Sequence, residues 1–99
     1  MKIKTSELQG AALDWAVAKC EEAIPHLGYR PSDNWEQGGP IIEREKISAK
    51  FSLDGRVYAD PIDRFGHWEG PTPLIAAMRC YVASKLGDEV EVPDELGRA

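Results

Sequence analysis

The segment between Thr72 and Gly87 constrains the fold more strongly than any other part of the sequence. Thr72 is a suitable N-cap, and Pro73 fits the first turn of a helix, where its missing N–H has no partner to lose. Gly87 suits the left-handed residue that commonly ends a helix. The stretch between them is apolar except for three strongly polar residues: Arg79, Ser84 and Lys85. The pattern predicts a helix over 73–86 that is covered on most sides and lies at the centre of the core.

A second apolar helix is predicted near the N-terminus. Apolar residues recur at helical spacing through 8–24 and occupy two adjoining faces. Thr5 or Ser6 can cap this helix, and Pro25 ends it. We predict a helix over about 6–23 that packs closely on the first one.

Between the two predicted helices, apolar residues recur at every second position, which is typical of strands. It predicts three of them: Ile41–Glu45, Ile47–Ser52 and Arg56–Ala59. Asp54-Gly55 is a common turn pair and predicts a hairpin. We therefore predict an α+β fold in which two helices pack on a small antiparallel β-meander of about three strands. Segments 25–40 and 60–72 are predicted to be long loops, and loops of that length are often functional.

The charge of the chain excludes some classes of partner. The 99 residues include 17 acidic and 12 basic ones, for a net charge of −5, and their number predicts a single domain over 1–99. Such a balance argues against binding to nucleic acid or to an anionic membrane. Residues 88–99 hold five acids and one base, so −4 of the charge belongs to this C-terminal segment. We expect Val90, Val92 and Leu96 to dock it on the body, which is nearly neutral and permits an anionic ligand.

The residues that could carry chemistry are few. Cys20 and Cys80 lie on apolar helical faces and are expected to be reduced and buried. With the two histidines, His26 and His67, they do not show the short paired spacing of a zinc site. No apolar run approaches the roughly 20 residues of a membrane span, and the N-terminus lacks a signal-peptide pattern. We expect no metal, no cofactor, no catalytic residue and no enzyme activity.

Four motifs in order resemble the NinX family, a set of small proteins encoded by lambdoid phages and prophages of enterobacteria. They are Met1–Leu8 (MKIKTSEL), Ala12–Lys19 (ALDWAVAK), Gly39–Glu45 (GPIIERE) and Gly70–Arg79 (GPTPLIAAMR). The resemblance implies a phage-encoded accessory protein that acts in the cytoplasm of the host bacterium. It implies no reaction and no catalytic residue.

Two tryptophans in the long loops are the leading candidates for a binding surface. Trp35 lies in Asn34-Trp35-Glu36-Gln37, and Trp68 lies between His67 and Glu69. Exposed tryptophan beside amide and charged side chains is typical of binding hot spots. The alternative is that both rings cap the core.

Arg79 is the most unusual single residue, because a charge within an apolar helix is costly unless it is paired. It could lie on an exposed stripe or pair with Glu43, Glu69 or Asp14 across the core. It could instead line a pocket beneath the two tryptophan loops and bind an anion. Glu43 itself is expected on a solvated edge strand, sharing the face of Ile41 with Glu45.

Two hypotheses follow for the function. In the first, the protein binds a host or phage protein through the Trp35 and Trp68 loops. In the second, it sequesters a small anionic ligand, such as a nucleotide-type signal, by tryptophan stacking and Arg79. The candidate binding residues are Trp35, Gln37, Glu43, Trp68, Thr72 and Arg79. A free sheet edge also makes a homodimer an open alternative.

Overall fold

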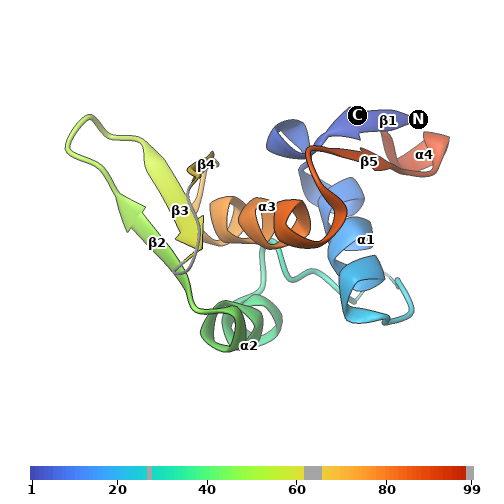
Figure 1. Ribbon diagram of the computed structural model, residues 1–99. Coiled ribbons are helices and arrows are strands. Elements are labelled where there is room, and N and C mark those ends of the chain that lie inside the picture. Colours follow the sequence, from blue (N-terminus) through green and yellow to red (C-terminus); the bar gives the residue numbers. More distant parts are fainter. Residues whose placement is uncertain (27, 62–65, 98–99) are drawn as a thin grey trace.

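The computed structural model describes residues 1–26, 28–61 and 66–97 and confirms the α+β fold. Helix α3 (Pro73–Leu86) lies at its centre, with the other elements around it (Figure 1). The Thr72 hydroxyl oxygen accepts a hydrogen bond from Ile75 N at 3.1 Å, and Gly87 follows the helix with a φ of 89°. Eight residues of α3 are buried, so this helix is where the apolar pattern predicted it and as central as predicted.

Helix α1 (Gly10–Glu21) begins later than the predicted residue 6. Gly10 has a φ of 56°, which interrupts the helical path, and a single 3-10 turn, η1 (Thr5–Glu7), precedes it. The predicted cap at Thr5 or Ser6 is wrong, because Gln9 occupies the N-cap position without a side-chain bond. Thr5 is instead buried, and its hydroxyl donates to Gly87 O at 2.6 Å, which joins η1 to the end of α3.

The predicted strand over 41–45 is wrong, because these residues form the second half of helix α2 (Trp35–Glu45). Asn34 caps the helix by accepting a hydrogen bond from Glu36 N at 2.9 Å. A Cβ built on Gly38 would lie 2.6 Å from Leu74 Cδ1 and closer still to a backbone oxygen, so this glycine allows α2 to approach α3. The alternation of Ile41 with glutamates over five residues was too short to separate a strand from a helix.

The antiparallel sheet is a meander with the order β2-β3-β4. Its strands are β2 (Ile47–Phe51), β3 (Val57–Pro61) and β4 (Trp68–Glu69). The predicted hairpin between β2 and β3 is confirmed, with Gly55 at a φ of 87° in its turn. The face of the sheet that carries Ile47, Val57 and Ala59 is buried against α3, while the tip of the hairpin projects from the body (Figure 1).

The two ends of the chain form a second, small sheet. Strand β1 (Lys2–Lys4) pairs with β5 (Glu89–Glu91), and a short helix, α4 (Asp94–Gly97), follows. The Met1 amino group donates to Val92 O at 3.0 Å and forms ion pairs with Glu91 and Asp94. Docking of the acidic segment by its apolar residues is confirmed, because Val90 and Val92 are buried while the acids stay exposed.

Candidate functional site

Trp35 is a large aromatic side chain that the fold leaves exposed. It lies in the first turn of α2, and 57% of its surface is accessible. Two sets of local hydrogen bonds hold this end of the helix. Asn34 caps it, and the Gln37 amide donates to Gly28 O at 2.7 Å and accepts a bond from Arg30 N. Trp35 is therefore presented on an anchored backbone, whereas the polar groups of Gln37, another candidate, are engaged within the chain.

Trp68 has a different environment. It lies in β4 opposite Ala59 and is half-buried against the core. The alternative in which a tryptophan caps the core therefore describes Trp68 and not Trp35. Helix α2 and strand β4 lie on either side of α3, so the structure does not bring the two tryptophans together in one surface (Figure 1).

Arg79 is buried, with 8% of its surface accessible, so an exposed stripe is excluded. Its Nε donates to Leu8 O at 2.7 Å, and a terminal nitrogen donates to Glu69 O at 2.8 Å. The predicted partners were carboxylates, but these two hydrogen bonds go to main-chain carbonyl oxygens. Burial lowers the pKa of Arg79. Its guanidinium thus joins the segment before α1 to the end of β4.

The remaining candidates are separate from one another. Thr72 caps α3 through its hydroxyl, and Glu43 is exposed on α2 rather than on an edge strand. Asp14, a predicted partner of Arg79, instead accepts a bond from Ser32 N at 2.9 Å, and burial raises its pKa.

A side-chain network that the sequence did not reveal joins three helices. Arg44 on α2 donates through both terminal nitrogens to Glu21 on α1, at 3.0 and 2.6 Å, and the Tyr81 hydroxyl on α3 donates to the same carboxylate. The bond from Arg44 is the main reason why the pKa of Glu21 lies below its usual value. Burial, followed by the bond to Glu21, raises the pKa of Tyr81. The fully paired groups indicate a structural role.

The arrangement closest to a catalytic one lies on the outer face of the sheet. Asp60 accepts a bond from Lys50 at 2.8 Å and contacts His67 Nδ1. Burial would raise the pKa of Asp60, but these two partners outweigh it and lower the pKa. Within residues 1–26, 28–61 and 66–97, no serine hydroxyl bonds to His67, and no group of three potential metal ligands occurs. Burial also raises the pKa of Cys20 to about 11, which is unfavourable for a nucleophilic thiol.

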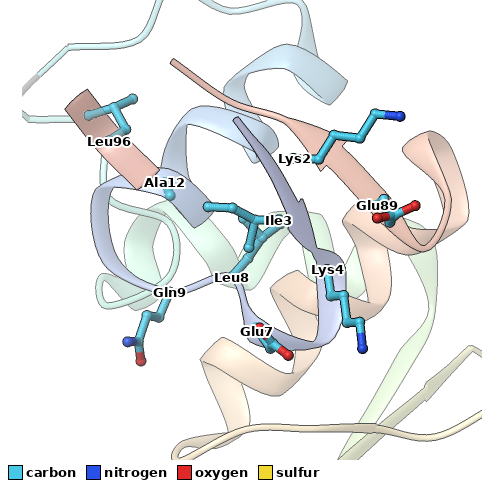
Figure 2. A pocket seen from close by; sticks show the side chains of 9 residues that line it. All are labelled: Lys2, Ile3, Lys4, Glu7, Leu8, Gln9, Ala12, Glu89 and Leu96. Atoms are coloured by element: carbon cyan, nitrogen blue, oxygen red, sulfur yellow. The ribbon is translucent and has the colours of Figure 1, made fainter. Parts of the chain in front are cut away.

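Three surface hollows lie away from the candidate residues. One of about 460 Å³ has Ile3 and Leu8 at its centre, while the charged ends of Lys2 and Lys4 point away from it (Figure 2). A second, of about 490 Å³, lies between α1 and the loop before α2, and the third borders β5. Neither tryptophan candidate nor Arg79 lines any of the three.

The sequence of this chain matches a known protein family. A family model described as Bacteriophage P22, NinX matches residues 23–85, which is more than half of the chain. The chain belongs to the bacteriophage P22 NinX family. This confirms the predicted resemblance, although the NinX match leaves out the two N-terminal motifs.

The NinX match begins after α1 and covers α2, the β2-β3-β4 sheet and nearly all of α3. All six candidate binding residues lie inside it. A search of the curated proteins found no match to this NinX family chain. In the part of the chain that the structure describes, no helix is long and apolar enough to cross a membrane.

Proposed function

We propose that this NinX family protein is a phage accessory protein that binds a host or phage protein in the cytoplasm of the infected bacterium, without catalysis of its own. The observation that carries the proposal is the 57% exposure of Trp35 on a helix end held by Asn34 and Gln37. An anchored tryptophan loses little conformational freedom on binding, which is why such residues dominate many interfaces.

The surroundings of Trp35 support a protein partner. Pro40 and Glu36 are also exposed on α2, and a Cβ built on Gly39 would lie 3.9 Å from the Trp35 ring. The indole thus lies near a glycine of its own helix, and the adjoining residue in the sequence is acidic. Such a surface fits a partner with an apolar pocket for the ring and a polar or basic rim.

The second hypothesis, a small anionic ligand, gains no support from the geometry. Two donors of Arg79 are already bonded to carbonyl oxygens of the chain, and Trp68 is half-buried against the core. Arg79 is buried and Trp68 is partly buried, so neither presents an open surface to an anion.

The test is affinity capture from cells carrying the phage, using the wild-type protein, Trp35→Ala and Ile24→Ala. Ile24 is the matched control, because 84% of its surface is exposed and it lies outside α2. We expect one stoichiometric partner with the wild type and with Ile24→Ala, and its loss with Trp35→Ala. With the purified partner, calorimetry should show binding that is weaker by about 30-fold or more.

Thermal unfolding of the variants checks that the fold is intact. Retention of the same partner by Trp35→Ala at unchanged affinity would contradict the assignment of the surface. Turnover of a substrate by the purified protein would contradict the non-catalytic role.

A further inference from the structure

We propose that the free edge of β2 pairs with the β2 edge of a second copy, in an antiparallel register centred on Ala49, and forms a continuous six-stranded sheet. The proposal goes beyond the protein-binding role and does not depend on Trp35. Strand β2 is the terminal strand of the sheet (Figure 1), and within the described residues β3 is the one strand hydrogen-bonded to it.

The hydrogen-bond pattern shows which backbone groups face this edge. Ser52 N donates to Arg56 O at 2.8 Å, and antiparallel pairs alternate between bonded and non-bonded positions. In the register of β2 and β3, Ser48 and Lys50 therefore bond to β3. The intervening residues Ile47, Ala49 and Phe51 direct their N–H and C=O groups to the free edge.

Two further observations agree with this alternation. Pro61 stands opposite Ile47, and it has no N–H to donate at that position. On the other side of the sheet, Gly70 N donates to Val57 O at 3.2 Å, so the Val57 carbonyl points to β4 and not to Phe51.

An antiparallel pair centred on Ala49 uses all of the outward groups. Ala49 then faces Ala49 of the second copy, and Ile47 faces Phe51 in both directions, which allows six main-chain hydrogen bonds. The side chains of Ile47 and Phe51 share the face that carries Val57, and 72% of Phe51 is exposed in the single chain. The pairing covers this apolar side chain.

Charge selects this register over its neighbours. Centred on Ala49, it places the exposed Lys50 opposite Ser48 of the second copy. The two neighbouring registers that also bond the outward groups place Lys50 of one copy opposite Lys50 or Lys46 of the other. Like charges directly opposite each other in a sheet are destabilising. Of these three registers, the one with the longest overlap is thus also the one free of lysine pairs.

The strands are short, so the dimer should be weak. Interfaces below about 1,200 Å² are typical of transient complexes, and we expect a dissociation constant on the order of 10–100 µM. Sedimentation equilibrium of the full chain from about 10 µM to 1 mM measures it. Hydrogen exchange should show concentration-dependent protection of the amides of Ile47, Ala49 and Phe51, with no change at Ser48 and Lys50.

Ala49→Pro tests the edge directly. The Ala49 N–H faces the edge, so proline removes no bond between β2 and β3, but it blocks the centre of the pair. We expect a folded protein that stays monomeric at 1 mM.

Substitutions of Ser48 test the register even if the proline variant fails to fold. Ser48→Lys places lysines opposite Lys50 twice and should weaken the dimer by roughly 3–10-fold, while Ser48→Glu should strengthen it by a similar factor. Within one chain Ser48 faces Asp60, so the same changes should shift monomer stability in the opposite directions. A monomeric wild type at 1 mM, a dimer without protection at the three amides, or equal dimer affinity in both Ser48 variants would overturn the proposal.

Discussion

Replacement of Arg79 by methionine tests how the buried guanidinium stabilises the fold. Methionine keeps an apolar stem of similar length and removes the bonds of 2.7 and 2.8 Å to the carbonyl oxygens of Leu8 and Glu69. A bond from a charged donor contributes about 1.5–3 kcal/mol, and a buried acceptor left without a partner costs about 1–3 kcal/mol. Removal of a buried charge also relieves its desolvation.

We therefore expect Arg79→Met to lower the free energy of unfolding by about 2–4 kcal/mol, out of the roughly 5–15 kcal/mol typical of a domain. Urea unfolding followed by circular dichroism measures the change. With a slope of about 1.5 kcal/mol per molar, the midpoint should fall by roughly 1–3 M.

Two matched variants sharpen the interpretation. Arg79→Lys keeps a charge but has a single donor nitrogen, so it should fall between the wild type and Arg79→Met. Arg30→Met removes an arginine whose side chain is 60% exposed, and it should change the free energy by less than about 0.5 kcal/mol. A loss below about 1 kcal/mol for Arg79→Met, at an unchanged slope, would refute the role assigned to the two carbonyl bonds.

Two further predictions concern α2 and its ion pair. Gly38→Ala should destabilise the protein by more than about 2 kcal/mol, because its Cβ would overlap both the Pro31 backbone oxygen and Leu74 Cδ1. Gly39→Ala should be neutral or stabilising by up to about 1 kcal/mol. Thermal unfolding compares the two variants, and equal effects would contradict the close packing around Gly38. The pKa of Glu21 is lower in the folded state than in the unfolded state. Its ion pair with Arg44 therefore stabilises the fold above the unfolded pKa of about 4.3, and this stabilisation is lost as the pH falls through the folded pKa. Glu21→Gln should therefore cost about 1–2 kcal/mol at pH 7 in chemical unfolding, with a difference from the wild type that shrinks below about pH 4; a difference independent of pH would contradict the ion pair.

The successes and failures of the sequence reasoning have local causes. The hairpin was predictable because Asp54-Gly55 encodes its own turn, and Gly55 has the required positive φ. Helix α2 was missed because two glycines and Pro40 lower its intrinsic helix propensity. Contacts of Gly38 with the rest of the core outweigh that deficit, and no pattern within the segment reveals them.

The candidate site shows the same division. The sequence identified Trp35 as a binding candidate, but its exposure depends on where α2 packs. It also marked Arg79 as unusual, but the partners it predicted were carboxylates, whereas the observed acceptors are main-chain carbonyl oxygens, which carry no residue signature. The network of Glu21, Arg44 and Tyr81 joins residues far apart in the chain, so neither spacing nor composition could assemble it.

By itself, the sequence determined the α+β class, the central helix α3, the β2-β3 hairpin, the docked acidic C-terminal segment and the family. Each of these depends on signals that lie within a few residues of one another: caps, apolar period, turn pairs and contiguous motifs. The tertiary structure alone decided that 41–45 is helical, that β1 pairs with β5, that Arg79 is satisfied by carbonyls and that Trp35 is exposed while Trp68 is half-buried. These outcomes depend on which surfaces meet across the core, and burial and packing there outweigh the local preferences of the chain.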